Sequence, residues 1–123
     1  MKKSILLILG LAVALAMVSG CATRDKRVIT DSSLHDKVSI VAVNTVMTPT
    51  GLLKVQVELK NPTDSIQRYM YRFEWFDANG MQVKNVLSAS IPDQIEREED
   101  KFISGIAPSP ACKDFRVRFI GPN

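Results

Sequence analysis

Residues 68–81 read Arg-Tyr-Met-Tyr-Arg-Phe-Glu-Trp-Phe-Asp-Ala-Asn-Gly-Met, and this stretch decides the fold. Aromatic side chains fall on every second residue and so share one face of a β-strand; they are Tyr69, Tyr71, Phe73 and Trp75. Residues 77–80 are a turn sequence in which Asn79 or Gly80 adopts positive φ at little cost, and residues 81–87 return as a partner strand. The stretch therefore predicts a β-hairpin whose first strand supplies the centre of the core.

Alternation of apolar and polar residues is also found before the hairpin. Residues 53–60 read Leu-Lys-Val-Gln-Val-Glu-Leu-Lys, the pattern of a strand with one buried and one solvated face. Residues 38–47 are apolar on both faces in places, which predicts a more central or doubly covered strand. Pro62 lacks an amide for the sheet, and Asn61 and Asp64 bond to the local backbone, so the strand ends near residue 60.

Further strands complete the predicted domain. Residues 101–106 and 115–120 each alternate as strands, a short edge strand is expected at Val28-Ile29, and Ile91-Pro92 with the charged run 96–100 bounds a loop. Six to seven strands at roughly ten-residue spacing predict an all-β fold, an immunoglobulin-like antiparallel β-sandwich with Trp75 between its sheets. A small barrel is the alternative.

The start of the chain has the layout of an export signal. Two lysines precede an apolar run over residues 5–18, which is too short to span a bilayer comfortably, and residues 18–21 read Val-Ser-Gly-Cys. These four residues resemble the lipobox of bacterial lipoproteins. The resemblance implies that the Cys21 thiol takes a diacylglyceryl group, that the bond between Gly20 and Cys21 is cleaved, and that the new amine is acylated, typically with palmitate. The alternative is an uncleaved anchor helix, which would tether the same domain.

The predicted lipid also indicates a location. Each buried methylene contributes roughly 0.8 kcal/mol, so two or three acyl chains make release from the membrane rare. In the sorting scheme of enteric lipoproteins, an Asp after the lipidated cysteine resembles an inner-membrane retention signal, and this chain has Ala22. The resemblance implies the inner leaflet of the outer membrane, facing the periplasm. We expect a signal peptide over residues 1–20, a lipidated cysteine and polar tether over 21–37, and the β-sandwich over 38–123.

Length, charge and cysteine content narrow the class of protein. Cleavage leaves about 100 residues, enough for one domain. The net charge of +3 includes the two lysines of the leader, so the mature chain carries about +1, which argues against nucleic acid or anionic lipid as its partner. With Cys21 committed to lipid, Cys112 has no intrachain partner. We predict a buried small hydrophobe there rather than a thiol that pairs with another chain.

One family resemblance extends beyond the leader. The residues 71–81, Tyr-Arg-Phe-Glu-Trp-Phe-Asp-Ala-Asn-Gly-Met, together with the lipobox and the Asn61-Pro62 turn, resemble the YcfL family of small bacterial envelope lipoproteins. The likeness is best in the aromatic strand and its hairpin, and looser across the rest of the domain. It implies an immunoglobulin-like sandwich and a lipid anchor, and it brings no activity, cofactor or active-site residue.

Catalytic groups are scarce in this sequence. The single histidine, His35, lies in the predicted tether, where no scaffold holds it against Cys112 or a serine. One histidine and one free cysteine do not make a zinc site, and the acidic residues of 96–100 lack the glycine-spaced loop of a calcium site. Glu74 and Asp77 would be a glycosidase pair only in a groove that so small a domain seldom has. We therefore expect no catalytic residues, no metal, no cofactor besides the covalent lipid, and no enzyme activity.

A charged surface is the remaining candidate site. With the aromatic residues facing the core, Arg72 and Glu74 point to solvent, and the same alternation turns Arg116 and Arg118 outward. If the two strands share a sheet, these four residues form one patch with apolar neighbours, and exposed arginines are favoured at interface centres. The alternative is an ordinary solvated sheet face.

The sequence thus predicts a non-catalytic, lipid-anchored envelope protein that binds or scaffolds another envelope component, a protein or the cell wall. One alternative is an accessory factor of peptidoglycan synthesis that contacts the wall or a synthase. A second is a small periplasmic hydrolase. The identity of the partner and the oligomeric state stay open.

Overall fold

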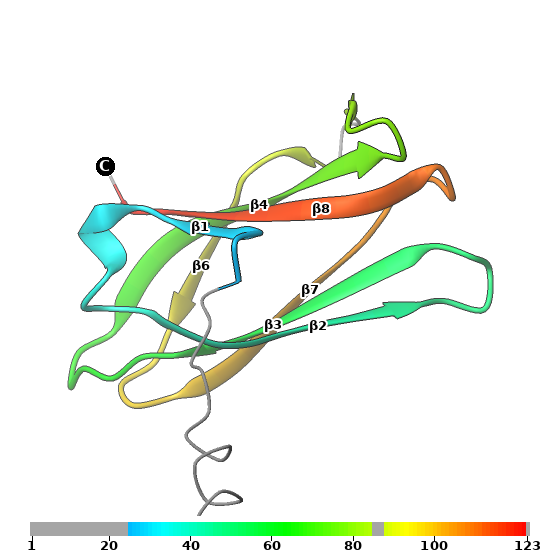
Figure 1. Ribbon diagram of the computed structural model, residues 1–123. Coiled ribbons are helices and arrows are strands. Elements are labelled where there is room, and N and C mark those ends of the chain that lie inside the picture. Colours follow the sequence, from blue (N-terminus) through cyan, green and yellow to red (C-terminus); the bar gives the residue numbers. More distant parts are fainter. Residues whose placement is uncertain (1–24, 85–87, 123) are drawn as a thin grey trace, which may run out of the picture.

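The computed structural model describes residues 25–84 and 88–122, which fold into two facing β-sheets (Figure 1). The predicted leader, the Gly20–Cys21 cleavage site and the lipidated cysteine lie outside these residues. In chain order the elements are β1 (Val28–Thr30), the 3-10 helix η1 (Ser32–Leu34), β2 (Ser39–Met47), β3 (Leu53–Lys60), β4 (Gln67–Asp77), β5 (Gln82–Val83), β6 (Ile91–Ile95), β7 (Asp100–Ile106) and β8 (Cys112–Ile120).

The larger sheet contains five strands and is built around β4. Its order is β1-β8-β4-β5, and β6 also pairs with β4. Because β8 occupies one edge of β4 from Met70 to Asp77, β5 and β6 share the opposite edge. The smaller sheet has the order β2-β3-β7, and every pairing except the parallel β1–β8 pair is antiparallel. The predicted antiparallel β-sandwich is confirmed, with eight strands over the described residues, of which β1 and β5 are very short.

The aromatic strand lies at the centre of the core, as predicted. Tyr69, Phe73 and Trp75 are buried on the inner face of β4, and Tyr71 is half-buried beside them. The rings of Phe73 and Trp75 stack with their centroids 5.7 Å apart and an interplanar angle of 12°. From the facing sheet, the alternating strand β3 contributes three fully buried side chains, Val55, Val57 and Leu59. The two sheets are therefore joined by apolar burial, at about 1.5–3 kcal/mol for each large side chain.

The expected loop at Ile91-Pro92 is instead a strand. Residues Ile91–Ile95 form β6 and pair with β4, so that Pro92 lies opposite Met70. An edge strand tolerates proline because one of its two edges needs no amide. The hairpin predicted after β4 is present, with Gly80 at a φ of 78°, but its return strand β5 has only two residues. The end of the expected strand, residues 85–87, lies outside the described part of the chain.

The prediction that residues 38–47 form a central, doubly covered strand is wrong. Strand β2 is an edge of the smaller sheet, with Val41, Val46 and Met47 exposed. A bulge between Ile40 and Ala42 shifts the alternation by one residue. The sequence therefore reads as apolar on both faces although only one face is covered.

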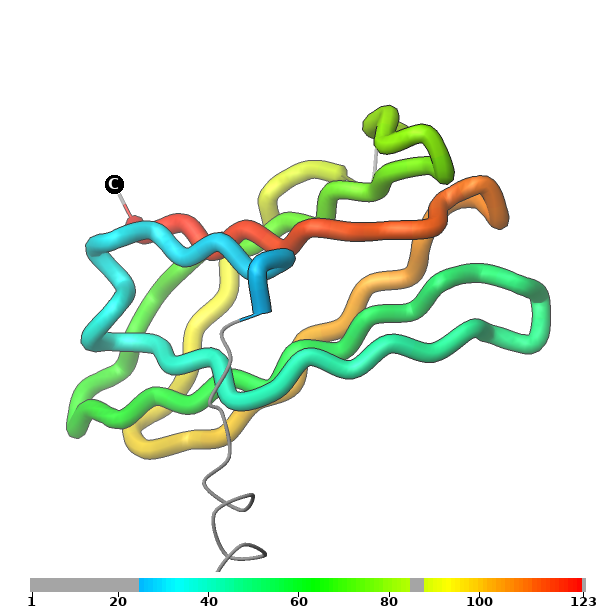
Figure 2. The backbone as a smooth tube through the Cα atoms, in the orientation of Figure 1, coloured from blue at the N-terminus to red at the C-terminus, as the bar shows by residue number. Residues whose placement is uncertain are grey.

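Ordered structure begins before residue 38, within the segment expected to be a tether. The short strand expected at Val28-Ile29 is confirmed as β1, and its residues pair in parallel with Val117 to Phe119 of β8. Leu34 then reaches the core and is fully buried. Figure 2 follows the chain from β1 in one layer through η1 to β2 in the other. Residues 28–34 thus belong to the sandwich and close one of its ends.

A buried asparagine connects the β3–β4 turn to the β6–β7 turn at one end of the sandwich. The side chain of Asn61 is fully buried, and its amide nitrogen donates to the carbonyls of Ser65, Ile95 and Glu96 at 2.7, 3.2 and 3.0 Å. Its oxygen accepts from the amide and the hydroxyl of Thr63, at 2.9 and 2.6 Å. The predicted local role of Asn61 is confirmed, and a contact with the β6–β7 turn is added to it.

No helix in residues 25–84 and 88–122 has the length and apolar character needed to cross a membrane.

Candidate functional site

The four residues predicted to form a surface patch lie together on the outer face of the larger sheet. Strands β4 and β8 are direct neighbours, and their register sets Arg72 opposite Arg118 and Glu74 opposite Arg116. Since Phe73 and Val117 point into the core, these four side chains point away from it. We call them the arginine patch.

Contacts within the arginine patch leave it with excess positive charge. The Nε of Arg118 donates to Oε1 of Glu74 at 2.7 Å, a diagonal ion pair in which the Glu74 side chain is only 12% exposed. The Arg116 guanidinium lies 5.3 Å from the centroid of the Phe76 ring, a cation–π contact. Neither Arg116 nor Arg72 has a carboxylate partner among the described residues. Glu74 therefore neutralises one of three arginines.

The opposite face of the sandwich has no such imbalance. The charged residues on the outer faces of β4 and β8 are four arginines and two carboxylates, namely Arg68, Arg72, Arg116, Arg118, Glu74 and Asp114. On the outer face of the smaller sheet, two lysines meet two carboxylates, namely Lys54, Lys60, Glu58 and Asp100. The described residues contain equal numbers of basic and acidic side chains, yet the positive charge is concentrated on one face.

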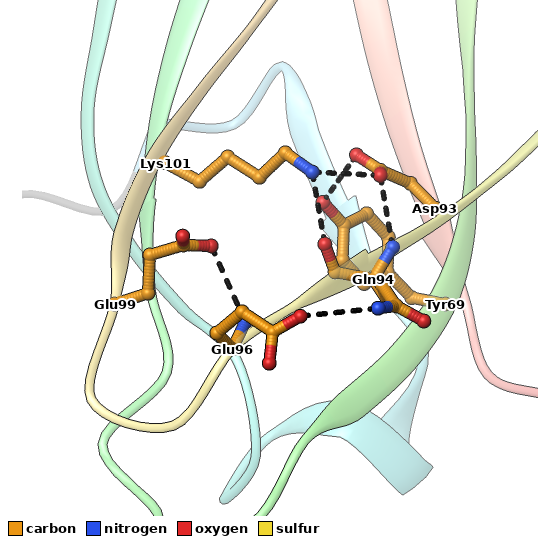
Figure 3. Close-up of polar contacts among 6 residues, drawn as sticks. All are labelled: Tyr69, Asp93, Gln94, Glu96, Glu99 and Lys101. Atoms are coloured by element: carbon orange, nitrogen blue, oxygen red, sulfur yellow. Dashed lines mark hydrogen bonds and ion pairs between the residues drawn. The ribbon is translucent and has the colours of Figure 1, made fainter.

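A second polar cluster, which the sequence analysis missed, joins the two sheets at their β6–β7 side (Figure 3). The Tyr69 hydroxyl donates to Oδ2 of Asp93 at 2.9 Å, and the Lys101 ammonium donates to Oδ1 of Asp93 at 2.7 Å and to the Gln94 carbonyl at 2.9 Å. Asp93 comes from β6 and Lys101 from β7, so the ion pair connects one sheet to the other. The sequence contains an indication of this cluster, because Asp93 lies two residues before the buried Ile95 and therefore shares its face of the strand. Pro92, directly before Asp93, makes the segment look like a loop.

The cluster changes the acidities of its members. Burial alone would raise the pKa of Asp93, but hydrogen bonds from Lys101, the Gln94 amide and Tyr69 together hold it below its usual value. Burial raises the pKa of Tyr69 strongly, and the neighbouring Asp93 carboxylate adds to the increase. The pKa of Tyr71 is raised for the same two reasons, burial first. Asp93 is thus held as a carboxylate and both tyrosines as neutral phenols, an arrangement suited to holding two sheets together.

The remaining titratable candidates are not assembled into a reactive group. His35 is exposed, and its Nε2 lies 3.3 Å from the Thr30 carbonyl oxygen, near the end of β8 where Thr30 pairs with Phe119. Cys112 is buried at the other end of β8, which confirms its predicted burial. At about 3.3 Å per residue, this strand separates the two by roughly 20 Å. Within residues 25–84 and 88–122, no three His, Cys, Asp or Glu side chains gather as metal ligands.

The two carboxylates considered for glycoside cleavage have other partners. Glu74 is bound to Arg118, and Oδ1 of Asp77 accepts the amides of Asn79 and Met81, each at 2.9 Å. Asp77 thereby closes the β4–β5 turn. The acidic stretch after β6 is also a turn, in which the Glu96 amide donates to the Glu99 carboxylate at 3.2 Å. The carboxylates of Glu74, Asp77 and Glu99 therefore each have a structural role.

Comparisons with known proteins extend these observations. No curated protein matches the chain. A crystal structure of Campylobacter jejuni cj0090 has a TM-score of 0.68 and 18% sequence identity, covering 80% of this chain and 100% of that one. A crystal structure of a DUF1425 family member from Shewanella sp. pv-4 has a TM-score of 0.65 and 18% identity, covering 85% of this chain and 98% of its own. At this identity the likeness shows the fold alone.

The model of one protein family matches residues 25–119 of the chain, from the segment before β1 almost to the end of β8. This match spans both sheets, the arginine patch and the Tyr69–Asp93–Lys101 cluster. The family is described as a protein family of unknown function. The chain therefore belongs to the DUF1425 family.

Proposed function

We propose that this protein is a non-catalytic, lipid-anchored envelope protein that faces the periplasm and binds an acidic protein partner through the arginine patch. The observation that carries the proposal is the unequal distribution of charge over the two faces of the sandwich. Arg72 and Arg116 lack carboxylate partners in the described chain, while the only glutamate of the patch is held by Arg118. A planar guanidinium with free N–H groups suits carboxylates, which it binds through two parallel hydrogen bonds.

The lipid anchor rests on the sequence of residues 18–21, and the fold is compatible with it. Strand β1 begins at Val28, so about seven residues separate Cys21 from the first strand, a reach of roughly 25 Å at full extension. An anchor of this length would hold the domain beside its membrane and favour a partner in the same envelope layer. The resemblance to the YcfL family of envelope lipoproteins supports the same location, the inner leaflet of the outer membrane.

The non-catalytic part of the proposal rests on the arrangement of reactive groups. His35 and Cys112 lie near opposite ends of β8, and Cys112 is buried in the core. A nucleophile and its base have to lie within hydrogen-bond reach of each other. The acidic residues Glu74 and Asp77 hold an ion pair and a turn instead of facing a shared groove.

Capture experiments on the lipidated protein test this function. The protein is purified in mild detergent and presented in parallel with solubilised envelope proteins and with peptidoglycan fragments, which also carry carboxylates. We expect a discrete envelope protein to be retained, and retention to fall at least tenfold for Arg72→Glu. Arg72 has no ion-pair partner to lose among the described residues, and the substitution reverses one charge of the patch.

The matched control reverses a charge on the other sheet. Lys60→Glu lies on the outer face of β3, and we expect it to leave capture unchanged. Retention of peptidoglycan fragments in place of a protein would replace the proposed partner with the cell wall. Equal losses for Arg72→Glu and Lys60→Glu, or turnover of wall fragments by the purified protein, would contradict the proposal.

A further inference from the structure

A hollow of about 480 Å³ adjoins the arginine patch at the end of the larger sheet. Its walls come from three parts of the chain that the fold brings together: the residues just before β1, the end of β4 with its turn, and the start of β8. Four of the lining side chains are basic, namely Lys26, Arg27, Lys113 and Arg116. The volume lies within the usual range of small-ligand sites.

The carboxylates in this hollow are already engaged. Oδ1 of Asp114 lies 3.2 Å from Nε of Arg27 and accepts the Phe115 amide at 2.9 Å. Oδ1 of Asp77 accepts the two amides of its turn. Lys26 and Lys113 have no carboxylate partner among the described residues. The hollow therefore keeps a net positive charge that its own acids do not cancel.

Two guanidiniums of the hollow are held against aromatic rings. Arg27 lies 5.2 Å from the centroid of Phe115, and Arg116 lies 5.3 Å from the centroid of Phe76. Stacking fixes the plane of a guanidinium and leaves N–H groups on its edge available to an oxyanion. Both groups line the same cavity, so an anion there would meet preorganised donors as well as two flexible ammonium groups.

The hollow also lies close to the predicted point of membrane attachment. Lys26 follows Cys21 by five residues, a distance of at most about 17 Å for an extended chain. If Cys21 carries the anchor, as in the proposed function on which this inference rests, Lys26 and its neighbours lie within reach of the lipid headgroups. Basic side chains are attracted electrostatically to the surface of a bilayer that contains anionic lipid. The low net charge expected for the cleaved chain argues against anionic lipid only if that charge is spread evenly, and the hollow instead gathers four basic side chains.

We propose that this hollow, between the residues preceding β1, the β4–β5 turn and the start of β8, binds a phosphate group, supplied by the headgroup of an anionic phospholipid. Arg27 and Arg116 hold the phosphate oxygens with their N–H groups, and Lys26 and Lys113 add charge from the rim. Occupation of the site orients the domain on its membrane, with the β4–β5 turn toward the headgroups.

The test uses the lipidated protein and follows its backbone amides by NMR. In neutral detergent, inorganic phosphate is added at constant ionic strength. In a second arm, the protein is embedded in nanodiscs of phosphatidylcholine with or without phosphatidylglycerol. We expect saturable shifts confined to the amides of Arg27, Gly80, Lys113 and Arg116 in the first arm, and shifts of the same amides when phosphatidylglycerol is present.

Two variants with the same loss of charge make the test specific. Lys113→Ala removes an exposed ammonium of the hollow, and we expect phosphate binding to weaken about fivefold, as for one exposed charge contact. Arg68→Ala removes a charge from the far end of β4, and we expect no change. Shifts with phosphate but none with phosphatidylglycerol would keep the site and assign it to a soluble phosphate compound.

Shifts spread over all basic residues, or equal weakening by both variants, would overturn the site. Lys113 is outside the arginine patch, so Lys113→Ala leaves capture of the protein partner unchanged. An unaltered protein that captures its partner but shows no phosphate shifts would contradict this inference alone, whereas phosphate shifts without capture of a protein would contradict the proposed function alone.

Discussion

At the scale of single residues, Asn61 connects parts of the chain that are distant in sequence. Its amide donates to the carbonyl of Ile95, 34 positions away, from a fully buried side chain. Removing it leaves the carbonyls of Ile95 and Glu96 and the amide of Thr63 without these partners. A buried polar group without a partner costs about 1–3 kcal/mol.

We therefore predict that Asn61→Ala lowers the free energy of unfolding by about 3 kcal/mol, measured by urea denaturation. The matched control is Asn44→Ala, which truncates an exposed asparagine of β2 and should change stability by less than about 0.5 kcal/mol. Similar losses of unfolding free energy in the two variants would show that the hydrogen bonds of Asn61 stabilise the fold no more than an exposed asparagine does.

Gly105 is a second residue with a defined steric role. It faces inward from β7, and a methyl group there would lie 2.7–2.8 Å from atoms of the Phe73 ring. Phe73 is in turn stacked on Trp75, so a shift of its ring away from residue 105 would disturb that stacking. The absence of a side chain at this position makes room for the aromatic core.

We predict that Gly105→Ala destabilises the fold by about 1–3 kcal/mol and alters the near-ultraviolet circular dichroism of Trp75. Ser104→Ala, at the neighbouring exposed position, should do neither. Combining Gly105→Ala with Phe73→Leu should cost less than the sum of the single changes, because the smaller side chain removes the clash. Strict additivity would rule out direct contact as the cause.

At the scale of elements, the ion pair between Asp93 and Lys101 links β6 to β7 and hence one sheet to the other. The pKa of Asp93 is lower in the folded protein than its ordinary value. The unfolded chain therefore binds a proton more readily than the folded chain in this range of pH. The contribution of Asp93 to stability is present above the ordinary carboxylate pKa and is lost as the pH falls through the lower, folded value.

We predict that the urea midpoint falls less between pH 7 and pH 3 in Asp93→Asn than in the unaltered protein, and that the variant is less stable at pH 7. Glu58→Gln, at a half-buried position on the outer face of β3 and with the same loss of charge, should leave the slope of midpoint against pH unchanged. Identical slopes for Asp93→Asn and the unaltered protein would remove Asp93 as a source of the acid sensitivity.

Elements also show what the sequence could and could not predict. The alternating patterns of β3 and β4 predict which side chains face inward, and the structure confirms both predictions. Alternation can be recognised from the sequence because it depends only on adjacent residues of one strand. Whether a strand is central or at an edge depends on its neighbours, so the sequence predicts a covered strand where the edge strand β2 lies. Pro92 favours a loop where the structure has β6. The arginine patch followed from alternation on two strands, whereas the Asp93–Lys101 pair required knowing that β6 and β7 belong to different sheets.

At the scale of the whole molecule, side chains of different polarity and charge occupy different parts of the sandwich. The interior is apolar and aromatic, the outer face of the smaller sheet is balanced in charge, and the outer face of the larger sheet carries the arginines. The hollow at the end of that larger sheet includes Lys26, which follows Cys21 by five positions in the sequence. A partner in the same envelope layer would therefore meet the arginine patch in a restricted set of orientations.

Site-specific photocrosslinking in intact cells tests the binding claim most directly. A photoreactive amino acid replaces Met70, two residues before Arg72 on the outer face of the larger sheet, or Gln56 at the matching centre of the smaller sheet. We predict a discrete protein adduct from position 70 and none from position 56. An adduct from position 56 alone, or equal adducts from both positions, would contradict binding through the arginine patch.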